Sequence, residues 1–178
     1  MTPETICVLM KDKFGQAVLD TALDGGHPHA VIDAARWPDI ARFLRDDPRL
    51  GFSFLRSVSA VDLSEKNKLA CIYDLLHIPL GPDRDQLITT TREFAVRIVT
   101  ERDDPHIPSV ADVWPTADWH EREAYDMMGI AFDNHPDLRR ILCPDDWEGH
   151  PLRKDYEFPL EYHGIPATTE YELTNPRH

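Results

Sequence analysis

The sequence predicts an α+β domain: a small antiparallel or mixed sheet with helices packed on one side, followed by a long extended C-terminal tail. Helical patterns precede the strand patterns, and three runs rich in strand-forming residues follow one another between residues 52 and 101. Proline then interrupts the remaining sequence repeatedly. We therefore expect a core domain over residues 1–144 and a partner-binding tail over residues 145–178.

The N-terminal third predicts two helices and one short strand. Residues 4–23 place their apolar side chains closer to a helical than to a strand period, with a break or bend near Gly15. The β-branched run from Ala30 to Asp33 follows the turn cluster DGGHP and predicts the first strand. Residues 37–48 predict a second helix that ends at Pro48.

Three strands follow and complete the predicted sheet. Residues 52–63 and 68–80 are rich in strand formers and are separated by SEKN, a pattern typical of a β-hairpin. Residues 91–101 alternate apolar and charged side chains. One face of this third strand is therefore expected to face the core.

A well-marked helix is predicted from Asp118 to Met128, after a proline-rich connection. Asp118 is expected to cap its first turn, with Glu121 three residues on as in a capping box, and Gly129 suits a left-handed stop.

The tail predicts little regular structure from about Asp145, because prolines recur every seven or eight residues from Pro136 to Pro166. Extended at about 3.3 Å per residue, it could span on the order of 100 Å, more than the diameter of the preceding domain. Large apolar side chains on such a segment need shelter, so we expect the tail to lie on another protein. These side chains are Trp147, Leu152, Tyr156, Phe158, Leu160, Tyr162, Ile165, Tyr171 and Leu173.

Composition argues against several functions. The net charge of −13 opposes binding to a phosphate backbone. No apolar run approaches the roughly 18 residues of a membrane helix, and the N-terminus lacks a secretory signal, which predicts a cytoplasmic protein. Cys7, Cys71 and Cys143 lie too far apart for a zinc or iron–sulfur motif, and no glycine-rich phosphate loop is present. We expect the protein to bind no cofactor by itself.

The segment WHEREAYDMMG is the densest polar cluster. His120, Glu121, Glu123 and Asp126 suggest a free-standing metal-dependent hydrolase as one alternative. A zincin motif would need histidine at Ala124, four residues after His120.

The structural interpretation of this cluster is favoured. Glu121 lies on the apolar stripe of the helix, and a partly buried carboxylate requires a partner. His135 and His150 each precede a proline in a turn, where bonds to backbone are more common than metal ligation. The expected partners of the carboxylate are Arg122, Arg139 and Arg140.

The segment WHEREAYDMMGIAFDNHPDLRRILCPDDWEGHPLRKDY closely resembles the signature of the 30-kilodalton subunit family of respiratory complex I, the NADH–quinone oxidoreductase of bacteria. The resemblance is strong from about Asp104 to Tyr156 and looser over the strands from Gly51. Positions that match the family pattern are Glu121, Arg122, Glu123, Asp126, Gly129, His135, Pro136, Arg139, Arg140, Gly149, His150, Pro151, Arg153, Lys154 and Asp155.

The resemblance implies a redox-inert structural subunit of the peripheral arm. Its partners would be the large quinone-site subunit of the 49-kilodalton type and neighbouring iron–sulfur subunits, at the cytoplasmic face of the cell membrane. The assembly would use FMN, iron–sulfur clusters, NADH and quinone through other subunits, and this protein would contribute no catalytic residue. The residues expected at the interface or in its support are Glu121, Arg122, Glu123, Asp126, His135, Arg139, Arg140, Trp147, His150, Arg153, Lys154, Asp155 and Tyr156.

One further alternative keeps the fold but changes the assembly. A related protein serves membrane-bound hydrogenases and formate hydrogenlyases, and the sequence holds no residue that separates this assembly from complex I.

Overall fold

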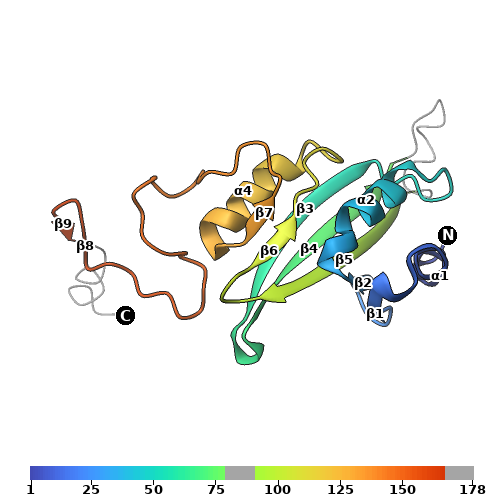
Figure 1. The fold of residues 1–178 in the computed structure, drawn as a ribbon, viewed down its shortest axis with the longest axis horizontal. Helices are drawn as coiled ribbons and strands as arrows, with labels where there is room; N and C mark the ends of the chain where they lie inside the picture. Colours follow the sequence, from blue (N-terminus) through green and yellow to red (C-terminus); the bar gives the residue numbers. More distant parts are fainter. Residues whose placement is uncertain (79–90, 167–178) are drawn as a thin grey trace, which may run out of the picture.

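The structure is a computed structural model that describes residues 1–78 and 91–166. Its main sheet has five strands in the order β1-β2-β5-β4-β3, and two short strand pairs lie outside it (Figure 1). The predicted α+β class, with a mixed sheet and an extended tail, is confirmed. The main strands are β1 (Val18–Ala22), β2 (His29–Ile32), β3 (Phe54–Leu63), β4 (Lys68–His77) and β5 (Arg92–Glu101).

Three α-helices occur in the described part of the chain. Trp37–Asp46 confirms the predicted second helix, and its C-cap Asp47 is extended because the following proline disfavours helical backbone before it. The helices are α1 (Pro3–Phe14), α2 (Trp37–Asp46) and α4 (Ala117–Met128); the 3-10 turns are η1 (Gly15–Ala17), η2 (Ala34–Arg36) and η3 (Ser64–Lys66).

The first predicted helix is correct only up to Gly15, which ends α1 with φ 55°. Residues 18–22, predicted to continue the helix, form strand β1. The Asp-Gly-Gly turn lets β1 fold back antiparallel on β2, so pairing in this hairpin prevails over the helix-like spacing of the apolar residues. The strand near Ala30 is therefore the second strand of the chain, not the first.

The predicted hairpin and third strand are confirmed. Strands β3 and β4 pair antiparallel around Asn67, whose left-handed backbone (φ 50°) closes the turn. Strand β5 pairs antiparallel with β4 and parallel with β2, which makes the sheet mixed. The end of the predicted second hairpin strand, residues 79–80, lies outside the described residues.

One face of the sheet carries the core. On β4 the alternate residues Leu69, Cys71 and Tyr73 join the buried apolar cluster, whereas Ile72 between them does not. Helix α2 packs on this face, with the rings of Trp37 and Tyr73 4.6 Å apart. The helices therefore cover one side of the sheet, as predicted.

Helix α4 packs along β3 at the edge of the sheet. Its N-cap is Thr116, without a side-chain hydrogen bond, and Asp118 lies inside the first turn. The predicted cap at Asp118 and the capping box with Glu121 are wrong: the helix already begins at Ala117, and the Glu121 carboxylate binds Ser109 and the Val110 N–H. The predicted stop at Gly129, with φ 73°, is confirmed.

The polypeptide beyond α4 leaves the sheet and extends to the end opposite α1 (Figure 1). Little regular structure occurs there, as predicted. Tyr171 and Leu173 of the predicted apolar set lie outside the described residues. The short strands are β6 (His106–Pro108) paired with β7 (Ala131–Asp133), and β8 (Glu161–Tyr162) paired with β9 (Ile165–Pro166).

Candidate functional site

Asp126 of α4 holds the segment that leaves the sheet. Its fully buried carboxylate accepts the backbone N–H groups of residues 141–143 at 3.0, 2.7 and 2.9 Å, and Nη1 of Arg140 at 2.6 Å. Burial raises the pKa of Asp126, but these hydrogen bonds outweigh it and bring the pKa to about 2. We call residues 139–156 the strap; this ionised carboxylate fixes its first turn.

The strap also covers the C-terminus of α4. Three of its groups lie on the carbonyl oxygens of residues 126–128: Nδ1 of His150 (3.0 Å), the backbone N–H of Leu152 (3.1 Å) and Nε of Arg153 (2.8 Å). Burial lowers the pKa of His150, so the ring is neutral and Nδ1–H donates. The arginine also offsets the negative end of the helix dipole.

Gly129 permits this close approach. It ends α4 in the left-handed region, and a Cβ there would come within 2.5 Å of the His150 ring and 2.9 Å of Arg153. Any larger residue would displace the strap from the helix.

A second anchor fixes the far end of the strap to the sheet. Arg102 donates two hydrogen bonds to Asp62 of β3, at 3.1 and 2.9 Å, and two to Asp155, at 2.9 and 2.5 Å. The backbone N–H of Lys154 donates to Asp62 at 2.9 Å. The guanidinium lowers the pKa of both carboxyl groups, so all three side chains are charged.

Glu121 is completely buried on α4, and none of the predicted arginines reaches it. Its carboxylate instead accepts from the Ser109 hydroxyl (2.6 Å) and the Val110 N–H (2.9 Å), with Nε2 of His135 3.9 Å away. Burial is the main influence on its pKa and raises it to about 7. The predicted ion pair at Glu121 is wrong, and Asp126 has the arginine partner instead.

His135 and Arg122 complete the polar contacts around α4. The buried ring of His135 accepts from the Asp137 N–H at 3.0 Å and its Nε2 lies 3.2 Å from the Asp118 carbonyl. Arg122 donates to the Arg139 carbonyl at 3.3 Å and lies over the Trp119 ring.

Arg139 itself contributes little to the strap. Among the described residues its exposed side chain pairs with the exposed Asp137 alone, at 2.9 Å. Of the three arginines within the strap, Arg140 and Arg153 bind α4 through their side chains and Arg139 does not.

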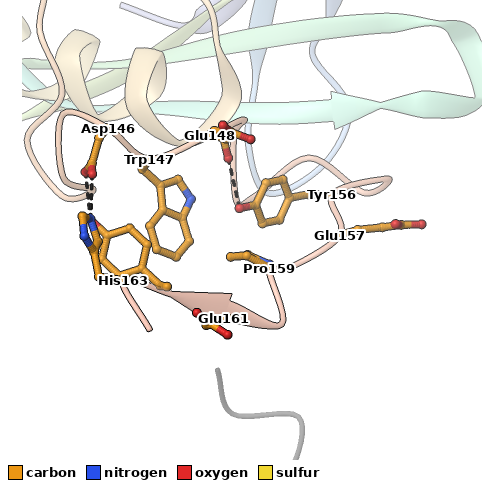
Figure 2. A pocket seen from close by; sticks show the side chains of 9 residues that line it. Asp146, Trp147, Glu148, Tyr156, Glu157, Pro159, Glu161 and His163 are labelled. Carbon is orange, nitrogen blue, oxygen red and sulfur yellow. Dashed lines mark hydrogen bonds and ion pairs between the residues drawn. The ribbon is translucent and has the colours of Figure 1, made fainter. Parts of the chain in front are cut away.

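The last part of the strap is aromatic. The Tyr156 hydroxyl donates to the Glu148 carbonyl at 3.2 Å, which closes the loop around Trp147 (Figure 2). These rings line a pocket with the residues of β8 that follow.

The cluster proposed for a metal hydrolase does not converge. Glu121 faces Ser109, Asp126 faces the strap, and Glu123 is exposed to solvent on α4. Within residues 1–78 and 91–166, no group of three or more His, Cys, Asp or Glu side chains is arranged to hold a metal ion.

The strap and the described tail leave large apolar side chains in solvent although the strap backbone is well ordered by hydrogen bonds. Each of the five is more than half exposed, from 57% for Leu152 to 75% for Leu160. They are Leu142, Leu152, Phe158, Leu160 and Ile165.

Three supporting residues escaped the sequence analysis: Asp62, Arg102 and Ser109. Asp62 lies on the face of β3 that also turns Val58 and Ala60 to the core, but a bulge between Leu55 and Ser57 interrupts the alternation that would have shown this direction in the sequence. Arg102 and Ser109 lie in connections, where the sequence pattern gives no facing direction.

The model of one protein family matches residues 30–162, and it describes the respiratory-chain NADH dehydrogenase, 30 Kd subunit. The protein belongs to this family. The resemblance drawn from the sequence is thereby confirmed, and with it the assignment to a subunit of a respiratory-chain complex.

Relatives of the 30 Kd family support the assignment. An NADH-quinone oxidoreductase subunit of Chlorobium phaeobacteroides is 46% identical over 160 residues, 88% of this chain and 90% of the relative. The equivalent subunits of Chloroherpeton thalassium (46%) and Saccharopolyspora erythraea (44%) align over 88% and 84% of this chain. The chain spans only 62% and 58% of these two longer relatives.

Two solved structures resemble the 30 Kd family fold seen here. The trypsin-resistant fragment (1-134) of Nqo5 is 29% identical with a TM-score of 0.60, and the match covers 78% of this chain and all of the fragment. One subunit of an archaeal membrane-bound sulfane sulfur reductase has a TM-score of 0.67 at 20% identity, covering 86% of this chain and 85% of that subunit, and shares the fold. In the described residues, no helix is long and apolar enough to cross a membrane.

Proposed function

We propose that this protein is a redox-inert structural subunit of the peripheral arm of a proton-translocating NADH–quinone oxidoreductase. It docks on the large quinone-site subunit, of the 49-kilodalton type, beside iron–sulfur subunits at the cytoplasmic face of the membrane. Its core, residues 1–144, supports a partner-binding tail, residues 145–178. FMN, iron–sulfur clusters, NADH and quinone are bound by other subunits.

The observation that carries this proposal is a strap held by polar contacts with its apolar side chains turned outward. Asp126 and Asp62 fix its two ends, while Leu142 and Leu152 are 63% and 57% exposed. Burying each such side chain against a partner would contribute about 2 kcal/mol. The strap therefore supports a permanent protein interface better than a catalytic site.

The anchoring also reduces the cost of docking. Fixing one residue's backbone costs about 1 kcal/mol, and this cost opposes association of any segment that is disordered beforehand. The hydrogen bonds of residues 139–156 to α4 and β3 order this segment within its own protein. The remaining tail then adds contact area from a fixed starting point.

Affinity purification of the full-length protein from native membranes tests the proposal. We expect the large quinone-site subunit and neighbouring iron–sulfur subunits to be recovered with it in equal amounts, identified by mass spectrometry. A protein that is recovered alone and monomeric would contradict the proposal.

Variants refine this experiment. Arg140→Ala and Arg153→Ala remove bonds to α4 and should lower recovery of the complex, whereas Arg139→Ala should have a smaller effect because it contacts only Asp137. Arg36→Ala, which breaks an exposed pair far from the strap, is the matched control. Equal recovery from all four would argue against the strap as an interface.

A second assembly is an alternative to complex I, because a subunit of an archaeal respiratory membrane complex has the same fold. The alternative is a related membrane-bound hydrogenase or formate hydrogenlyase. A large subunit with two nickel-binding CxxC motifs, recovered in the same purification, would identify that assembly.

A further inference from the structure

A pocket of about 510 Å³ opens between the strap and the β8–β9 hairpin (Figure 2). No contact described above uses this space, and it lies on the segment proposed to meet a partner. Its lining combines aromatic rings with carboxylates, and its chemistry identifies what it would bind.

Three aromatic side chains form the apolar walls. The rings of Trp147 and Tyr162 are tilted, with centroids 5.1 Å apart, and Tyr156 stands on the other side of the space (Figure 2). Phe158 supports Tyr156 edge to face at 5.0 Å. Faces of such rings attract cations through their quadrupole.

Carboxylates surround these rings, and three of them lack a cationic partner among the described residues. Glu148, Glu157 and Glu161 line the pocket and are solvent-exposed, with no hydrogen bond or ion pair from their side chains. The fourth, Asp146, is already bound by the Tyr162 hydroxyl (2.8 Å) and by His163 (2.7 Å). The lining is therefore negative and unneutralised.

An indole donor at this pocket also has no acceptor. Nε1 of Trp147 is buried, yet it has no hydrogen-bond partner in the described part of the chain. Because this atom is enclosed, the part of Trp147 that lines the pocket is the rest of its ring.

We propose that this pocket receives a lysine or arginine side chain of the protein on which the tail docks. The cationic head lies between the aromatic rings and is neutralised by Glu148, Glu157 and Glu161. The inference rests on the proposed function, because it assigns one contact within that interface.

The chemistry excludes the other simple occupants. An anion would be repelled by three free carboxylates, and an apolar side chain would leave them without a partner. A peptide cation interacts favourably with both the rings and the carboxylates.

Nuclear magnetic resonance of the isolated, ¹⁵N-labelled full-length protein tests the pocket without any partner. The probe is N-acetyl-arginine methylamide, with N-acetyl-norleucine methylamide as the uncharged control. We expect the arginine probe to shift the Trp147 indole signal in a saturable, salt-sensitive manner while the Trp119 signal stays in place. Equal shifts from both probes, or none, would overturn the proposal.

A triple variant, Glu148→Gln/Glu157→Gln/Glu161→Gln, should weaken binding of the arginine probe by about fivefold or more, since each exposed charge contributes modestly. The matched control is Asp12→Asn/Asp24→Asn/Glu65→Gln, which removes three exposed carboxylates elsewhere. A similar loss in both variants would indicate a general charge effect and overturn the site.

The native complex provides the second measurement. The pocket variant should dissociate from its partner at a lower salt concentration than the control variant. If the wild-type protein has no partner at all, the proposed function is wrong. The titration with the arginine probe then still shows whether the pocket binds a cation. If the probe binds but both variants dissociate alike, the pocket is not the partner's contact and the proposal is wrong.

Discussion

Helix α2 and the strap are held to the same domain by opposite means. The strap has no fully buried residue anywhere between 139 and 156, and its attachments are hydrogen bonds and ion pairs. Helix α2 instead inserts one apolar face into the core. Its buried residues are Trp37, Ile40, Ala41, Phe43 and Leu44.

The difference separates stability from recognition. Apolar burial on α2 stabilises the fold, is non-directional and depends little on pH or salt. Charged anchors position the strap backbone without burying its apolar side chains, which remain exposed for contact with another protein. Four measurements test this division, in order of the effect expected.

Trp37→Ala should produce the largest loss. The ring is fully buried and packs against Tyr73, so its removal leaves a cavity and should lower the free energy of unfolding by about 4 kcal/mol. Chemical denaturation of the purified protein measures it. A loss below that of any strap variant would break the comparison.

Asp126→Ala should cost about 3 kcal/mol, because it leaves Arg140 and three strap amides without their acceptor. The effect should be local: hydrogen exchange should quicken across residues 139–156 and stay slow in α2. Asp137→Ala, which removes an exposed carboxylate, is the control. Uniformly faster exchange would show that the strap and the core unfold as one unit.

Glu121 should make the stability of the protein depend on pH in the range just below neutral. Its pKa is raised from 4.5 to about 7, so its contribution to stability is complete below pH 4.5 and is lost as pH rises through 7. Between pH 5 and 7 the loss should approach about 2 kcal/mol relative to Glu121→Gln, measured by thermal denaturation of both proteins. Parallel pH profiles for the two would refute it.

The pKa of Asp126, on the same helix, is shifted in the opposite direction, so its contribution to stability has the opposite pH dependence. Its pKa is lowered from 3.8 to about 2, so its contribution is present above pH 3.8 and is lost only as pH falls through 2. The strap should therefore stay attached at pH values where Glu121 is titrating.

The smallest effect on stability should come from the outward side chains. Leu142→Ser and Leu160→Ser replace residues that are 63% and 75% exposed, and each should change the free energy of unfolding by less than about 0.5 kcal/mol. Both should nevertheless reduce recovery of the proposed complex. Val8→Ser on α1, 55% exposed, is the control, and equal recovery from all three would separate these leucines from the interface.

The sequence predicted those parts of the fold in which local pattern and long-range pairing agree. Strands β3, β4 and β5, helix α2 and the stop at Gly129 carry unambiguous periods or turn residues. Strand β1 was missed because its five residues have a helix-like spacing and are fixed only by pairing with β2.

The candidate site was predicted by residue type but not by partner. Arg140 was among the arginines expected to pair with Glu121 but pairs with Asp126, whereas Glu121 binds a hydroxyl and an amide from the preceding connection. Spacing along a helix fixes which face a side group occupies. It does not fix which loop will cross that face.

The parallel ladder between β2 and β5 bears on how the protein is made. Its partners, such as Ala30 and Val96, are joined by a long stretch that contains α2 and the β3–β4 hairpin. During synthesis on the ribosome, the N-terminal hairpin has to wait with an unpaired edge until β5 has emerged. Nascent polypeptides stalled before residue 92 should therefore depend most on chaperones.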